Sequence, residues 1–328
     1  MSGVTVDACP TIARMTTIEE LGARAFGEAP DNPLATTLAL AVMHDGEVVY
    51  ERYADGYDHE STFISWSMAK SMTSALCGVY VDRGELDIEA PAAIGEWQSG
   101  DDPRSQITLR QLLEMRSGLA WNEDYVDEQV SDVIEMLFGG GKADVAAYAA
   151  ARPLAHEPGS HFCYSSGTTN LIARILGEHL GGRDGMETAL QNDLFGPAGM
   201  TNAIPKFDAA GTFVGSSFVY APARDFLAFG ELFRNGGLGP DGARVLSQDW
   251  VDQSVIEHSV DEESGQGYGL HWWLVRDDHG SYCCNGYEGQ RIQVVPTLGL
   301  TFVRLGKTDA QYSDDLRAFY AEVVETFA

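Results

Sequence analysis

The stretch Phe63-Ile-Ser-Trp-Ser-Met-Ala-Lys-Ser71 decides the interpretation of this chain. It opens a run of apolar residues that predicts a buried helix from Ser65 to Arg83, ended by Gly84. Side chains three positions apart lie on the same face of a helix, so Ser67 and Lys70 are expected side by side. A serine becomes nucleophilic when a neighbour takes its proton, and a lysine in an apolar site loses its own proton more readily. The spacing therefore predicts a nucleophile next to its base.

The alternative is that this pair has no catalytic role, with Ser67 at a helix start and Lys70 exposed to solvent. With 21 serines and four lysines in 328 residues, chance alone gives about a quarter of one such match. An unpaired lysine among Trp66, Met68, Ala69 and Met72 would, however, be costly to bury. The apolar neighbours favour the functional interpretation.

The elements around this helix predict an α/β protein with a helical insertion. Asp45-Gly46 separates two strand-like runs between residues 38 and 52, a strong hairpin signal. Further strands are predicted at 268–275, 291–295 and 300–305, and helices at 107–119, 168–180, 222–235 and 314–327. We therefore predict an α/β (α+β) domain from residues 1–83 and 245–328, a mainly helical domain from 84–244, and an active site at their interface.

The composition limits which kinds of molecule the protein is expected to bind. The chain carries 21 Lys and Arg against 49 Asp and Glu, a formal net charge of −28, which argues against nucleic acid or an anionic membrane. Its five cysteines include no Cys-x-x-Cys pair, and we expect buried free thiols rather than disulfides. No signal peptide or membrane span is recognised, so a cytoplasmic protein is expected. No motif predicts a metal or a cofactor, and the sequence leaves the oligomeric state open.

Several phrases, in order along the chain, resemble the serine β-lactamase and penicillin-binding-protein superfamily. Besides residues 63–71, they include Ile107–Leu119, Tyr164-Ser-Ser166, Pro222-Ala-Arg-Asp225 and Gly286-Tyr-Glu-Gly-Gln290. The sequence is most similar to the 6-aminohexanoate-dimer hydrolases and the β-lactamase-like (family VIII) carboxylesterases. The resemblance implies a β-lactamase/transpeptidase-like fold, with an antiparallel sheet flanked by helices from both termini.

The resemblance also implies roles for individual residues. Ser67 would be acylated, Lys70 would share or accept its proton, and Tyr164 would act as general base and acid, its pKa lowered by Lys70. The backbone N–H groups of Ser67 and Tyr287 would form the oxyanion hole. The candidate substrate-binding residues are Ser166, Tyr125, Asn285, Gly286 and Ser216. For Ser166 the alternative is an ordinary helix cap, and for Tyr125 it is a solvated acidic loop.

The last of the superfamily's three active-site motifs, which we call the third motif and which falls at residues 284–286, indicates the class of substrate. Penicillin-recognising members carry Lys-Thr-Gly where this chain has Cys284-Asn285-Gly286, and the missing lysine would normally attract a carboxylate. We therefore predict a cofactor-independent serine hydrolase of carboxylic esters or small linear amides. The alternatives are a β-lactamase or D-Ala-D-Ala peptidase, and a non-catalytic binding protein of the same fold.

Overall fold

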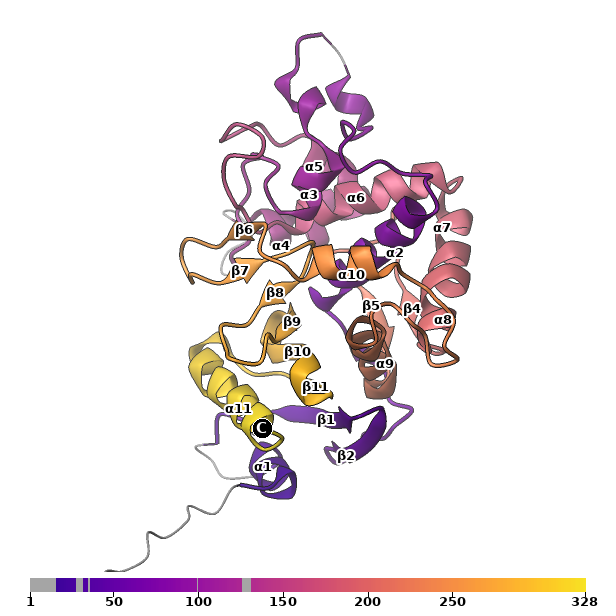
Figure 1. Ribbon diagram of the computed structural model, residues 1–328. Coiled ribbons are helices and arrows are strands. Elements are labelled where there is room, and N and C mark those ends of the chain that lie inside the picture. The colour runs from indigo at the N-terminus through magenta and orange to yellow at the C-terminus, as the bar shows by residue number, and fades with distance from the viewer. Residues whose placement is uncertain (1–15, 28–31, 35, 99, 126–130) are drawn as a thin grey trace, which may run out of the picture.

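A large antiparallel sheet forms the base of the molecule in the computed structural model, which describes residues 16–27, 32–34, 36–98, 100–125 and 131–328 (Figure 1). The strand order is β2-β1-β11-β10-β9-β8-β7-β6. The strands are β1 Thr37–His44, β2 Glu47–Tyr53, β6 Ser259–Val260, β7 Gly267–Tyr268, β8 Trp273–Leu274, β9 Tyr282–Gly286, β10 Gln290–Val295 and β11 Leu300–Gly306. Strand β1 pairs with β11, so the predicted sheet built from both ends of the chain is confirmed.

The predicted hairpin is present. Asp45 and Gly46 have φ angles of 51° and 84°, as a tight two-residue turn with both central residues left-handed requires. The turn joins β1 to β2, and β1 is buried along most of its length because it lies between two neighbouring strands.

Helices from both termini cover one face of the sheet. Helix α1 (Ile18–Ala25) begins with a capping box between Thr17 and Glu20, and α11 (Ser313–Glu325) lies beside it (Figure 1). Their apolar faces pack on the sheet in one cluster, made of residues such as Leu21, Phe319, Val323, Leu40, Val42 and Phe302. We call this side the outer face.

Two central helices cover the inner face. Helix α9 (Ala223–Arg234) packs against β11, β10 and β1, and α2 (Met68–Asp82) packs against β9 and β10. Residues 68–80 of α2 are all buried, as the predicted shortage of polar positions required. Because α2 also contacts α6 (Ser166–His179), it joins the sheet to the helical part of the molecule.

The helical part contains short elements around α6. They are η1 Gly95–Trp97, η2 Pro103–Gln106, α3 Leu109–Leu113, α4 Asp132–Leu137, η3 Gly140–Ala143, α5 Val145–Ala150, α7 Arg183–Ala189, η4 Leu190–Phe195 and α8 Gly196–Ala198. A small sheet of β3 (Phe63–Ile64), β5 (Val219–Ala221) and β4 (Ile204–Pro205) lies next to them. The remaining elements are α10 Gln248–Ser254, η5 Tyr287–Gly289, η6 Pro296–Leu298 and η7 Ala310–Tyr312.

Two predicted elements are shorter than expected. The helix predicted at 107–119 is helical only over α3, because Met115 and Gly118 take φ angles of 56° and 78°. A Cβ at Gly118 would lie 2.4 Å from the His156 carbonyl oxygen, so a close backbone contact outweighs helix propensity there. The strand predicted at 268–275 is interrupted at His271, with a φ of 64°, and forms β7 and β8.

The predicted division into two domains stays a prediction, although α9, inside the range assigned to the helical domain, packs on the sheet. The four cysteines within the described ranges, Cys77, Cys163, Cys283 and Cys284, are free thiols, and Cys9 lies outside those ranges. Of the helices in the described part, none is long and apolar enough to cross a membrane. The described residues contain no group of three or more His, Cys, Asp or Glu side chains placed to hold a metal ion.

Candidate active site

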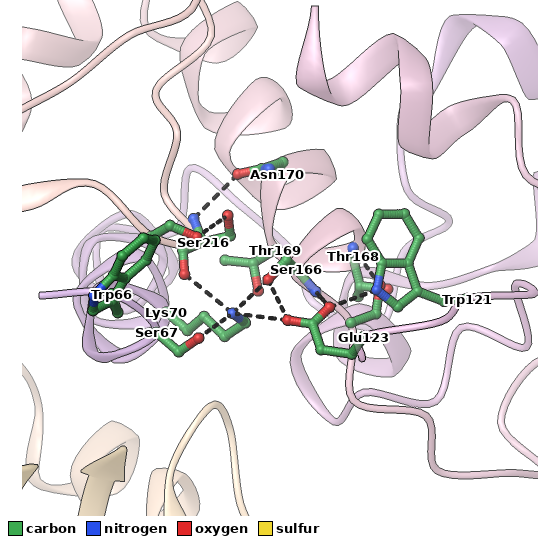
Figure 2. Close-up of polar contacts among 12 residues, drawn as sticks. Trp66, Ser67, Lys70, Trp121, Glu123, Ser166, Thr168, Thr169, Asn170 and Ser216 are labelled. Atoms are coloured by element: carbon green, nitrogen blue, oxygen red, sulfur yellow. Dashed lines mark hydrogen bonds and ion pairs between the residues drawn. The ribbon is translucent and has the colours of Figure 1, made fainter. Parts of the chain in front are cut away.

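The first turn of α2 brings Ser67 and Lys70 together. Ser67 is the residue before the helix and already has near-helical dihedral angles, so Lys70 lies one turn further along the same face. Lys70 Nζ donates to Ser67 Oγ at 2.9 Å, and the lysine is only 1% exposed (Figure 2). The predicted pairing of serine and lysine is therefore present in the structure.

The buried ammonium group has three acceptors, one for each of its N–H bonds. Besides Ser67 Oγ, it donates to Ser166 Oγ at 2.9 Å and to the Ser216 carbonyl oxygen at 3.1 Å. Ser216 is held in place because its own N–H donates to Asn170 Oδ1 on α6. Candidate residue Ser216 thus meets Lys70 through its backbone, while its hydroxyl pairs with Ser217.

Glu123 also faces this ammonium, and the sequence analysis missed it. Its carboxylate accepts hydrogen bonds from Ser166 Oγ at 2.5 Å and Ser166 N at 2.8 Å, and lies 3.9 Å from Lys70 Nζ. Trp121 Nε1 donates a hydrogen bond to Glu123 Oε2 at 2.5 Å (Figure 2). We call Lys70, Ser166 and Glu123 the Lys70 cluster. In it the Ser166 hydroxyl accepts from the lysine and donates to the carboxylate.

Burial is the main influence on the charge of Lys70. It lowers the pKa of the ammonium to about 8, and the carboxylate of Glu123 acts in the opposite direction. At neutral pH most molecules therefore carry a protonated lysine, and an accessible minority carry the neutral amine. His271, whose Nε2 contacts Thr169 Oγ1, remains neutral because burial lowers its pKa to about 3.

Tyr164 lies in the segment before α6, and its ring faces the Lys70 ammonium. Lys70 Nζ lies 4.8 Å from the centre of its ring, which packs against Trp273 and Tyr268. Burial, followed by the charge of Glu123, raises the pKa of the phenol, and hydrogen bonding with Ser67 only partly offsets this. The predicted lowering of the Tyr164 pKa by Lys70 is therefore wrong: the pKa is raised because burial disfavours the phenolate, and the partners that lower it are Ser67 and Trp273. The phenol is therefore neutral in the resting site.

The end of β9 approaches the nucleophile closely. A Cβ at Gly286 would lie 2.5 Å from the Ser65 carbonyl oxygen, so only glycine allows this approach. Tyr287 follows directly and brings its ring to within 5.6 Å of Trp66, the residue before Ser67. In the described part of the chain, the N–H groups of Ser67 and Tyr287 donate no hydrogen bond to another residue. Both donors remain available to a substrate oxygen.

The comparisons with known proteins agree with this geometry. Residues 23–325 match the family model described as Beta-lactamase. The chain belongs to the β-lactamase family. It is 25% identical to the 6-aminohexanoate-dimer hydrolase of Paenarthrobacter ureafaciens over 286 residues, which covers 82% of this chain and 72% of that protein.

Solved structures in the family share the fold. A Bacillus anthracis protein provisionally described as a 6-aminohexanoate-dimer hydrolase superposes with a TM-score of 0.77 at 21% identity, over 92% of this chain and 83% of that one. A family VIII carboxylesterase gives a TM-score of 0.70 at 14% identity, over 94% and 99% of the two chains. The predicted family and its β-lactamase/transpeptidase-like fold are therefore confirmed, and its relatives include an amidase and an esterase.

The other candidate residues in this β-lactamase-family site lie in different surroundings. The cap of α6 is Ser165, whose hydroxyl accepts from Thr168 N, so the Ser166 hydroxyl is free for Lys70. The side chain of Asn285 lies away from the Lys70 cluster and accepts a hydrogen bond from Arg291 Nη1 at 2.6 Å. Tyr125 stacks on Tyr287 with ring centres 4.5 Å apart, and its role as a lid residue stays a prediction.

A cluster of aromatic rings, which we call the aromatic rim, begins at Trp66, the residue directly before Ser67. Ring contacts of 4.5–6.4 Å connect its five members: Trp66, Tyr125, Phe138, Phe218 and Tyr287. Phe138 is 49% exposed and Tyr287 is 40% exposed, which is unusual for large apolar rings. Trp66 takes a φ of 45°, a left-handed conformation that is strained for a bulky residue. Apolar surface is thus presented to solvent next to Ser67.

Proposed function

We propose that the protein is a serine hydrolase that cleaves carboxylic esters or small linear amides through an acyl-enzyme on Ser67. The observation that carries the proposal is the 2.9 Å contact between Lys70 Nζ and Ser67 Oγ, with the lysine almost fully buried. The amidase and esterase among its relatives support the same class of reaction.

Lys70 begins the reaction in its neutral form. With a pKa of about 8, about a tenth of the molecules hold the neutral amine at pH 7. The amine takes the proton of Ser67 Oγ, and the oxygen attacks the carbonyl carbon of the substrate. The ammonium that results is stabilised by Ser166 Oγ and the Ser216 carbonyl oxygen.

The negative charge that develops on the carbonyl oxygen is stabilised by the N–H groups of Ser67 and Tyr287. Each such donor is worth about 3 kcal/mol in comparable enzymes. Gly286 supports this role because it lets β9 approach the backbone at Ser65.

Tyr164 completes the acylation step. When the C–O or C–N bond breaks, the phenol gives its proton to the leaving alcohol or amine and regains one from the Lys70 ammonium. Its raised pKa suits a group that is protonated before the reaction. Water then attacks the acyl-enzyme and gives a proton to the neutral Lys70. The bond between the acyl carbon and Ser67 Oγ breaks, the proton returns from Lys70 to Ser67 Oγ, and the carboxylic acid is released.

The third-motif position favours esters and linear amides over β-lactams. Cys284 stands where penicillin-recognising members have lysine, and it is 1% exposed on the inner face of β9. A buried thiol gives a substrate carboxylate no cationic partner. The rings of the aromatic rim suit an apolar acyl or leaving group instead.

Intact-mass spectrometry after incubation with a fluorophosphonate tests the proposal. We expect one adduct on the wild-type chain, located at Ser67, and none on Ser67→Ala. Ser67→Ala should also lose at least about 10³-fold in the rate of p-nitrophenyl butyrate hydrolysis. Ser160→Ala, which alters an exposed serine, is the matched control and should behave as wild type. An unmodified Ser67, together with normal turnover by Ser67→Ala, would refute the proposal.

A further inference from the structure

A second cavity lies on the outer face of the sheet. It has a volume of about 730 Å³ and is bounded by α11, by β9 and β10, and by the loop from Val275 to His279. Side chains alternate along β9, so Cys284 points into the core near α2, while Cys283 and Asn285 point to the outer face. Most of the groove is therefore on the other side of β9 from Ser67, and Gly286 and Tyr287 at the end of β9 line both regions. Its size is typical of small-molecule sites.

Arg291 lines this groove with a guanidinium that is only 7% exposed. Its Nε and Nη2 donate to Gln293 Oε1 at 3.0 and 2.6 Å, and its Nη1 donates to Asn285 Oδ1 at 2.6 Å. Three of its five N–H bonds are thus used, all on neutral amide oxygens. No carboxylate in the described ranges lies within 4 Å of it. The ring of Tyr320 lies 4.8 Å from this guanidinium and stabilises it in part by a cation–π contact, but it supplies no negative charge. A buried cation without a counter-charge is costly.

Arg304 on the neighbouring strand shows what a purely structural buried arginine looks like here. Its guanidinium makes five hydrogen bonds, to the hydroxyl groups of Thr37 and Thr308 and to the carbonyl oxygens of Glu288 and Gly289. All five of its N–H bonds are therefore used, and none is left for a further ligand. The two arginines on the walls of the groove also have partners, since Arg276 pairs with Glu257 and Arg317 with Asp314. Arg291 differs from all three.

We propose that this groove binds a small monocarboxylate with an apolar chain, at a site separate from Ser67. The two unused N–H bonds of Arg291 match the two oxygens of a carboxylate, which a guanidinium recognises in a forked geometry. Leu316, Ala321 and Val324 of α11 line the groove and give the chain apolar contacts. Four acidic residues also line it, Asp277, Glu288, Asp309 and Glu325, and they disfavour a dianion such as phosphate.

Calorimetric titration with hexanoate tests this site, whether or not Ser67 is a nucleophile. We expect hexanoate to bind the wild-type protein and hexanamide, its neutral analogue, to bind about tenfold or more weakly. Ala321→Trp fills the groove and should weaken hexanoate binding by about tenfold or more. Ala318→Trp alters an exposed residue of the same helix outside the groove, so it should leave binding unchanged.

Arg291→Gln should weaken hexanoate binding to the same extent as Ala321→Trp. If Arg291→Gln does not fold, as judged by circular dichroism, the Ala321→Trp and Ala318→Trp pair still decides the matter. The proposal is overturned if hexanoate does not bind, if hexanamide binds equally well, or if Ala321→Trp leaves binding unaltered. Displacement of hexanoate by inorganic phosphate at similar concentration would overturn the carboxylate assignment.

Discussion

The Lys70 cluster and the aromatic rim both adjoin Ser67, yet different forces hold them in place. In the cluster, every polar group has a partner at 2.5–3.1 Å, and Lys70 is almost fully buried. The rim is held mainly by contacts between rings, with a hydrogen bond between Tyr125 and Ser166 as its link to the cluster, and Phe138 and Tyr287 are exposed to solvent. Under the proposed function, this difference predicts that the cluster moves protons and that the rim contacts the substrate.

The largest effect is expected from Lys70→Met, which keeps a chain of similar length but removes the amine. Turnover of p-nitrophenyl butyrate should fall by about 10³-fold, because Ser67 loses its proton acceptor. Steady-state kinetics on protein shown to be folded by circular dichroism measures this. Lys142→Met alters an exposed lysine and is the control. A loss smaller than about tenfold would show that Lys70 is not the proton acceptor for Ser67.

An intermediate effect is expected from Glu123→Gln, which keeps an acceptor for Ser166 and removes the negative charge. That charge raises the pKa of Lys70, so its removal lowers the pKa further and neutral lysine persists to lower pH. The acidic limb of the pH profile of kcat/KM should therefore move down by about one pH unit or more, with at most about a tenfold loss at the optimum.

Asp124→Asn is the matched control for this experiment, because it removes the same charge from the next, exposed residue. Its pH profile should coincide with that of the wild type. If both variants shift equally, the effect comes from overall charge and Glu123 has no special role beside Lys70.

The smallest effect is expected from Phe138→Ala. Losing an exposed ring should raise KM for long-chain p-nitrophenyl esters by roughly three- to tenfold, about 1 kcal/mol, because part of the apolar contact disappears. The pH profile should not move, since Phe138 contacts no member of the Lys70 cluster. Ile204→Ala, a change at a residue that is 45% exposed and outside the rim, is the control. A shifted pH profile would show that the rim and the cluster are not independent.

The features predicted correctly from the sequence are those with a local cause. The hairpin at Asp45-Gly46 depends on two adjacent residues, and the pairing of Ser67 with Lys70 depends on one helical turn. The predicted helices at 222–235 and 314–327 match α9 and α11 closely, because an apolar stripe and a helix end mark each of them.

The features missed depend on contacts between distant segments. Glu123 stands in an acidic run beside Asp124, and nothing local marks it as the residue that meets Ser166, which is 43 positions away. The helix predicted at 107–119 stops early because Gly118 meets the backbone of His156. The direction of the Tyr164 pKa shift also depends on burial, which only the assembled fold determines.

The left-handed backbone at Trp66 has a consequence for how the catalytic centre tolerates change. Such a conformation costs a non-glycine residue about 1–2 kcal/mol, which the surrounding contacts must offset. Glycine at this position would remove the penalty but would also remove the indole that contacts Phe138, Phe218 and Tyr287. The protein therefore gives up some folding free energy to keep an aromatic side chain directly before Ser67, where it joins the rings of three other segments.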